Sequence, residues 1–251
     1  MTNSPSPAPI LDVVNIEVVY NAIALVLKGV SLNVPKGGVV ALLGANGAGK
    51  TTLLNTLSQI VRPVSGSIRF AGRDLSRARP EEVVEAGIIH VPQGRRLFAG
   101  LTVKENLLQG TYLRKDRSEI EKDLARVFRL LPRLAERADQ PAGQLSGGEQ
   151  QMCAIGRGLM GRPRLLLIDE LSLGLAPMTV DRLMGMVRRI NESGATVILV
   201  EQSLNRALSL ADRCFFMERG EIRFEGPTTE LMARDDLLRP VFLGTASSGL
   251  G

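Results

Sequence analysis

Two kinds of hydrophobic pattern alternate along most of this chain. Short, continuous apolar runs are typical of strands that are buried on both faces of a parallel sheet. In other stretches, such as SEIEKDLARVFRLL, apolar residues recur every three or four positions, which is typical of amphipathic helices. The alternation predicts an α/β fold with a mostly parallel sheet covered by helices on both faces. The buried-strand runs are residues 39–44, 87–92, 165–168 and 196–200.

Other segments predict elements outside that sheet. The region from Leu11 to Val34 is β-branched and roughly alternating, so we expect a half-exposed antiparallel sheet there. A helix should begin near Lys50, and residues 94–160 should form a helical insertion. The remaining expected elements are a turn–strand–turn at 65–72, a helix from Met178 to Ile190, and a hairpin at 214–226 that turns at Arg219–Gly220.

These patterns define the expected domain organisation. One domain should cover residues 10–244, with a core made of 10–93 and 161–244 and a helical subdomain at 94–160. The Pro/Ser-rich residues 1–9 should be a disordered tail, and residues 245–251 a second tail.

Composition excludes several classes of function. The net charge is +5, but basic and acidic residues are interleaved without a block of like charges, which argues against nucleic acid as a partner.

Cys153 and Cys214 lie in apolar surroundings without metal-ligand spacing and predict buried, reduced thiols. The single histidine, His90, is expected to be an ordinary strand residue rather than a catalytic one. No signal peptide and no apolar run long enough to span a bilayer are visible, which predicts a cytoplasmic protein.

A glycine-rich loop lies between a predicted strand and a predicted helix. Its sequence GANGAGKTT fits the G-x-x-x-x-G-K-[ST] pattern, in which backbone N–H groups and the helix start surround a phosphate. Lys50 supplies a point charge for the β- and γ-phosphates, and the Thr51 hydroxyl is a ligand for Mg²⁺. The predicted nucleotide-binding residues are Gly44, Ala45, Asn46, Gly47, Ala48, Gly49, Lys50, Thr51 and Thr52.

Two carboxylates follow a buried-strand run in RLLLIDE. Adjacent anions at a buried strand end are costly unless a cation or water compensates them. Asp169 is therefore predicted to hold Mg²⁺, and Glu170 to polarise the water that attacks the γ-phosphate.

A third motif, LSGGEQQ, lies 23 positions before the acids, counted as 169 − 146. A serine hydroxyl and two glycine amides at a helix start form a second anion site, although S-G-G-E alone is also a simple capping motif. One nucleotide does not need two such sites in one chain. We therefore expect this one to close over a nucleotide that a second subunit holds.

Together these motifs resemble the ATP-binding subunits of ABC transporters, over about Ile10 to Gly244. The resemblance implies a P-loop NTPase (RecA-like) core with an antiparallel β subdomain and an α-helical subdomain. It also implies ATP and Mg²⁺ as cofactors, ATP hydrolysis coupled to transport, and two ATPase domains paired head to tail beneath membrane permease subunits. The expected location is the cytoplasmic face of the inner membrane.

The resemblance also assigns roles to individual residues. Tyr20 would stack on adenine, and Gln93 would meet Mg²⁺ and the attacking water. The segment from Leu171 to Leu175 would link the two nucleotide sites. The residues that would reach the partner's nucleotide are Ser146, Gly147, Gly148 and Glu149.

Two positions depart from the family pattern. Leu171 replaces the usual proline after the catalytic acid, which should loosen the backbone there. Gln202 replaces the usual switch histidine; its amide still bonds a phosphate or water and serves as a catalytic residue, but it cannot carry a titrating charge.

The exact sequences of several segments indicate a subfamily. The segments GANGAGKTTLL, VPQGRRLF, SLGLAP and LVEQS are similar to the smaller ATPase of bacterial branched-chain amino acid importers (the LivF type), in which a periplasmic binding protein delivers the solute. The sequence P-Q-G-R around Gln93 also resembles the ATPases of urea and short-amide importers. Alternatives of another class are a soluble ABC ATPase acting on DNA or ribosomes and a cassette that only binds ATP. The sequence leaves open whether the ATPase partner is identical or different.

Overall fold

The computed structural model describes residues 9–234 and 236–237 of the chain. Residues 1–8 of the predicted tail 1–9, residues 235 and 238–244 of the predicted domain, and the predicted tail 245–251 lie outside the described residues. The chain divides into two compact units. Unit 1 contains residues 1–78 and 200–251, and unit 2 contains residues 79–199.

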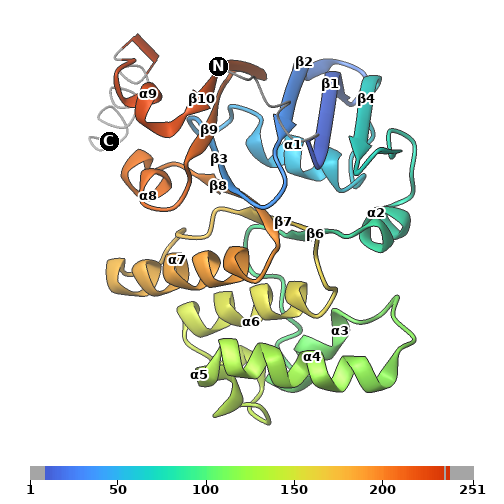
Figure 1. Ribbon diagram of the computed structural model, residues 1–251, viewed down its shortest axis with the longest axis vertical. Coiled ribbons are helices and arrows are strands. Elements are labelled where there is room, and N and C mark those ends of the chain that lie inside the picture. Colours follow the sequence, from blue (N-terminus) through green and yellow to red (C-terminus); the bar gives the residue numbers. More distant parts are fainter. Residues whose placement is uncertain (1–8, 235, 238–251) are drawn as a thin grey trace, which may run out of the picture. The chain divides into compact units, whose positions relative to one another are not determined.

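Unit 1 contains an antiparallel sheet with the strand order β2-β1-β4-β5. Figure 1 shows β2, β1 and β4 side by side. In β1, buried residues alternate with partly exposed ones along much of the strand, as the sequence pattern predicts for a half-exposed sheet. The bounds are β1 Leu11–Tyr20, β2 Ala24–Val34, β4 Ser65–Phe70 and β5 Arg73–Asp74.

A second group of strands in unit 1 follows the order β10-β9-β3. All five residues of β3, Val39–Leu43, are buried, and the strand is parallel to β9. The hairpin that the sequence predicts is formed by β9, Arg213–Glu218, and β10, Glu221–Pro227, with Arg219 and Gly220 as its turn. The helices of this unit are α1 Lys50–Leu57, α8 Leu204–Leu208 and α9 Thr228–Met232.

Unit 2 contains three neighbouring strands in the order β8-β7-β6. The strands β6, Ile88–Val91, and β7, Leu165–Asp169, are parallel, with Ile88 opposite Leu165. All residues of β7 and of β8, Thr196–Glu201, are buried, which confirms the prediction of buried strands. The last two residues of β8 belong to unit 1.

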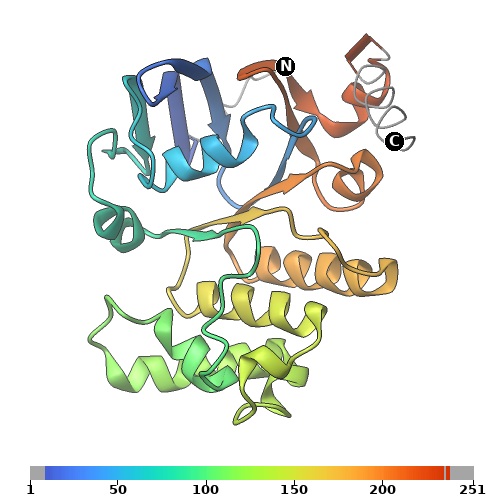
Figure 2. The ribbon, with the colours of Figure 1, turned by 180° about the vertical axis from the view of Figure 1, so that it is seen from behind.

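The rest of unit 2 is helical, and α6 lies between α4 and α7 in both views (Figures 1 and 2). This arrangement confirms the helical stretch that three- and four-residue spacing predicts. The division expected at residues 94–160 stays a prediction, because unit 2 also includes β6, β7 and α7. The helices are α2 Pro80–Ala86, α3 Val103–Gln109, α4 Arg117–Leu130, α5 Pro132–Ala135, the 3₁₀ helix η1 Ala142–Gln144, α6 Gly147–Leu159 and α7 Pro177–Glu192.

Candidate functional site

The glycine-rich loop connects buried β3 to α1, as the sequence predicts. Its three glycines, Gly44, Gly47 and Gly49, all have positive φ angles of 150°, 78° and 106°. At Gly44 a Cβ atom would lie 2.2 Å from the carbonyl oxygen of Met217, so a side chain there is excluded by the backbone of β9. The loop therefore keeps a conformation that other residues would not adopt without strain.

The start of α1 can bind an anion. Gly49 is the N-cap residue and provides no side-chain hydrogen bond, and the first turn contains no acidic residue. The first N–H groups of a helix have no partner within the helix, and the helix dipole favours negative charge there. This end of α1 is therefore suited to phosphate.

Lys50 is the first residue of α1 and is buried, with 5% of its surface exposed. Its Nζ donates hydrogen bonds to the carbonyl oxygens of Gly44 and Ala45, each at 2.8 Å. The ammonium group is thus held over the start of the glycine-rich loop. A positive charge in this place is what the β- and γ-phosphates of a nucleotide require.

Of the other predicted residues of unit 1, Ala48 is buried and the rest are at least partly accessible. Thr51, Ala45 and Asn46 are exposed, and Thr52 is half-buried. Tyr20 ends β1 with 37% of its surface exposed, and Gln202 lies exposed directly after β8.

The two predicted acids of unit 2 lie at the end of β7. Asp169 is the last residue of that strand and is 1% exposed, whereas Glu170 follows it with a positive φ of 50°. A non-glycine residue in this region of backbone space is uncommon and often marks a functional position. Leu171, which departs from the family pattern, is completely buried, so its side chain is part of the apolar core.

The structure brings Gln93 and Glu170 together. The Gln93 Nε2 atom donates a hydrogen bond of 2.8 Å to Glu170 Oε2, although the two residues are 77 positions apart. This bond orients the carboxylate of Glu170.

The serine–glycine motif begins α6 as a complete capping box. Ser146 is the N-cap residue, and its Oγ accepts from the Glu149 N–H at 3.4 Å and donates to Glu149 Oε2 at 2.7 Å. Arg137 pairs with the other oxygen of Glu149 at 2.9 Å. Burial alone would raise the pKa of the Glu149 carboxyl, but the bonds from Ser146 and the nearby arginines lower it overall. Ser146 therefore caps α6 and is also exposed at the surface.

Sequence reasoning missed a third group of residues in unit 2. Arg157 of α6 donates to the carbonyl oxygen of Arg96 at 2.7 Å and to that of Arg95 at 3.2 Å. Arg95 in turn donates to Gln150 of α6 at 2.9 Å. The segment that follows Gln93 is therefore fastened to the helix that begins at the serine–glycine motif. No sequence signal marks an arginine that binds backbone carbonyls.

The donor chemistry fits Mg²⁺. Thr51 in unit 1, and Asp169 and Gln93 in unit 2, all offer oxygen atoms, which hard cations prefer. Within residues 9–234 and 236–237, no cluster of three or more His, Cys, Asp or Glu side chains could hold a metal by itself.

The buried strand, glycine-rich loop, lysine-headed helix and acidic strand end define the chain as a P-loop nucleotide-binding protein. Residues 27–172 match the ABC transporter family. The chain is 45% identical over 218 residues to the high-affinity branched-chain amino acid transport ATP-binding protein BraG of Pseudomonas aeruginosa, covering 87% of this chain and 93% of BraG. The chain therefore belongs to the ATP-binding, ATP-hydrolysing subunits of ABC transporters.

Solved structures agree with this assignment. One, an ATP-binding cassette of an ABC transporter in its ADP conformation, is 28% identical with a TM-score of 0.81, covering 94% of this chain and 99% of that one. Another, a dimeric post-hydrolysis cassette bound to ADP and Pi, is 26% identical with a TM-score of 0.78, covering 87% and 98%. Among the described residues, no helix is both long and apolar enough to cross a membrane.

Proposed function

We propose that this chain powers an importer for branched-chain amino acids from the cytoplasmic face of the inner membrane. The substrate is supported by the similarity to BraG, whose name states that transport activity. The expected partners are a second ATPase subunit, identical or different, two permease subunits and, indirectly, a periplasmic solute-binding protein.

The observation that carries the proposed reaction is the hydrogen bond between Gln93 and Glu170 at the end of β7. Glu170 is proposed to accept a proton from the water that attacks the γ-phosphate, with Gln93 orienting its carboxylate. Asp169 and Thr51 are proposed to hold Mg²⁺, which would neutralise charge on the phosphates. Lys50 and the loop N–H groups are proposed to bind the phosphates.

The second half of the proposal concerns the partner subunit. Ser146, Gly147 and Gly148 are proposed to contact the γ-phosphate of a nucleotide held by that partner, and Tyr20 to stack on adenine. Gln202 is proposed to bond the phosphate or the attacking water through its amide. The dimeric cassette bound to ADP and Pi, 26% identical to this chain, supports pairing of two such subunits.

Replacing Glu170 with glutamine tests the catalytic step. The amide keeps an oxygen that accepts the bond from Gln93 but cannot accept a proton, so turnover should fall by about 10²–10⁴-fold. ATP affinity should stay within about twofold, because no phosphate-binding group is lost. Phosphate release and ATP titration on the assembled transporter measure the two effects.

Glu192→Gln is the matched control, since this exposed acid at the end of α7 lies outside the sequence motifs. Its turnover should equal that of the wild type. Undiminished hydrolysis in Glu170→Gln would disprove the assigned base.

The substrate is tested separately by uptake into vesicles that contain the complete transporter and its binding protein. ATP-driven accumulation of labelled leucine, isoleucine or valine is expected. The competing branch predicts accumulation of urea or a short amide instead, and that result would replace the amino acids as substrate.

A further inference from the structure

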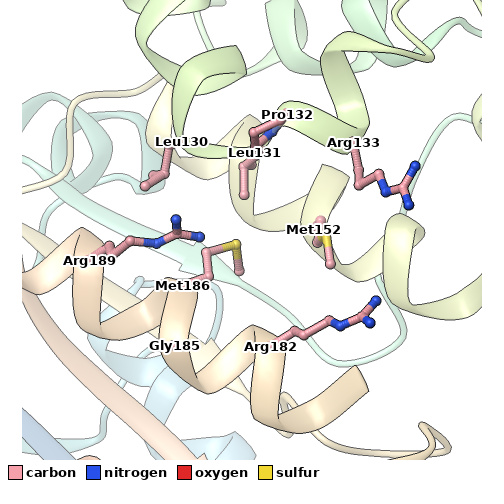
Figure 3. Close-up of a pocket in the computed structure, with 9 residues that line it drawn as sticks. All are labelled: Leu130, Leu131, Pro132, Arg133, Met152, Arg182, Gly185, Met186 and Arg189. Atoms are coloured by element: carbon pink, nitrogen blue, oxygen red, sulfur yellow. The ribbon is translucent and has the colours of Figure 1, made fainter. Parts of the chain in front are cut away.

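A pocket of about 330 Å³ lies in unit 2, and none of the predicted nucleotide-site residues lines it (Figure 3). The junction of α4 and α5 forms one side, α7 forms the other, and Met152 of α6 lies between them. Its volume is in the range of small-molecule sites. The lining residues are Leu130, Leu131, Pro132, Arg133, Met152, Arg182, Gly185, Met186 and Arg189.

The floor of the pocket is apolar. Leu131 and Met186 are 3% and 2% exposed, and the side chains of Leu130 and Met152 are half-buried beside them. Methionine adapts its shape to an apolar ligand more readily than branched residues do. This floor favours a ligand with a hydrocarbon body.

The rim of the pocket is positively charged. Arg133 and Arg182 extend at one end from opposite sides, and Arg189 lies at the other end (Figure 3). The nine lining residues include three arginines and no acid. Arg133 pairs with Glu136 at 2.9 Å, whereas no ion pair within the described part of the chain involves Arg182 or Arg189. Guanidinium groups that are not committed to a carboxylate can bind one bidentately.

Gly185 opens the recess between two of these arginines. It lies inside the sixteen-residue helix α7, three positions after Arg182 and four before Arg189, so all three share one helix face. A Cβ atom there would meet no atom within 4 Å, so packing does not require glycine. Glycine in a helix interior costs stability relative to alanine. The space that this residue leaves is therefore a feature of the pocket, not of the core.

We propose that this pocket binds a small organic monoanion with an apolar body, such as a short-chain or branched monocarboxylate. The hydrocarbon part would lie on Leu131 and Met186, and the carboxylate would bond Arg182 or Arg189. A free amino acid is disfavoured, because its ammonium group would lie among guanidinium groups without an acidic partner.

Occupancy of the pocket would affect two helices that carry functional segments. Met152 belongs to α6, which begins at the serine–glycine motif, and Met186 belongs to α7, which follows the segment from Leu171 to Leu175. A ligand that contacts both side chains would restrain α6 relative to α7. This regulatory part rests on the proposed function, whereas the binding site itself does not.

Calorimetric titration of the full chain with hexanoate tests the site, without nucleotide. We expect saturable binding to one site, weakened about tenfold by Arg182→Gln or Arg189→Gln, because each change removes a charged hydrogen-bond donor. Gly185→Leu should abolish binding by filling the recess, and the variant should fold because a Cβ atom at this exposed position meets no atom within 4 Å. Arg117→Gln, an exposed arginine of α4 outside the pocket, is the control and should bind as the wild type does.

Hexylamine has the same hydrocarbon body with the opposite charge and should not bind. Absence of saturable hexanoate binding, equal binding of hexylamine, or undiminished binding to Gly185→Leu would each overturn the site. Glu170→Gln should bind hexanoate normally, so failure of the catalytic proposal would not affect this result.

The regulatory part is tested by the ATPase rate of the assembled transporter. Hexanoate should change that rate at least twofold in the wild type and leave the Gly185→Leu rate constant. Binding without any change in rate would overturn the regulatory part alone.

Discussion

At the scale of single residues, burial determines the chemistry of the one histidine. His90 lies in β6, as predicted, and burial lowers its pKa to about 4. The imidazole is therefore neutral at physiological pH, and the prediction of an ordinary strand residue agrees with its place in the sheet. Sequence pattern could place His90 in a strand, but the pKa follows from packing that the pattern does not contain.

This pKa predicts a pH-dependent stability. The ordinary value of 6.5 applies in the unfolded chain, so between pH 6.5 and pH 4 the unfolded state binds a proton that the folded state does not. Stability therefore falls as the pH falls through this range, by about 2 kcal/mol between pH 7 and pH 5. Urea unfolding of the wild type and of His90→Gln at pH 7 and pH 5 measures this change in the free energy of unfolding.

In His90→Gln, this contribution to the pH dependence of stability should be absent. The carboxylates should contribute equally to the pH dependence of both proteins. Identical slopes for the two proteins would show that the imidazole is protonated in the folded state.

At the scale of elements, the β9–β10 hairpin positions the glycine-rich loop. The turn has φ angles of 48° at Arg219 and 86° at Gly220, which suits a two-residue hairpin. The Gly220 N–H donates to the carbonyl oxygen of Ala48 at 2.9 Å, and its own carbonyl accepts from the Lys28 N–H at 2.9 Å. One turn thus fixes the loop and β2 together.

Replacing Gly220 with alanine should break this support. The Cβ atom would lie 2.1 Å from the carbonyl oxygen of Val26, so the turn must move away from the loop. We expect a loss of about 1–2 kcal/mol from the left-handed backbone and about 1–3 kcal/mol more from the collision. ATP affinity should fall as well, which urea unfolding and nucleotide titration measure.

Gly37→Ala is the matched control, because Gly37 has the same φ of 86° but open space around its Cβ position. It should lose only the stability that the left-handed backbone costs an alanine, and its ATP affinity should be unchanged. Equal losses in the two variants would remove the hairpin as a support of the loop.

At the scale of the whole molecule, the predicted nucleotide residues are distributed between two compact units. The glycine-rich loop and Gln202 belong to unit 1, whereas Gln93, the serine–glycine motif and the acidic end of β7 belong to unit 2. The family shows that this chain binds ATP, so nucleotide should stabilise the chain as a whole.

ATP at a hundredfold excess over its dissociation constant should raise the free energy of unfolding by about 2.7 kcal/mol. Lys50→Ala should lose most of this increment, because it removes the charge held over the loop. Thermal unfolding with and without ATP and Mg²⁺ measures the increment within each protein. An equal increment in Lys50→Ala would exclude a role for this ammonium in nucleotide binding.

Sequence alone predicted the parts of the fold and candidate site that are local in the chain. The strand–loop–helix around Lys50 and the acids that end β7 follow from short patterns whose physics is confined to a few neighbouring residues. The bonds of Arg157 to residues 61 and 62 positions away were not predictable, because tertiary packing alone creates them. The recess at Gly185 was missed for the same reason. A glycine within a helix forms a pocket only where side chains of other helices surround it, and the sequence pattern does not show which side chains those are.

The two buried cysteines have a practical consequence for studying assembly. Burial raises the pKa of Cys153 to about 11 and also raises that of Cys214, so neither thiol forms the reactive thiolate readily. Maleimide reagents should therefore leave the native chain unlabelled. Ser146→Cys, at an exposed position, would be the single site modified, so a dye or crosslinker there could report whether a second subunit approaches this helix start without prior removal of either natural cysteine.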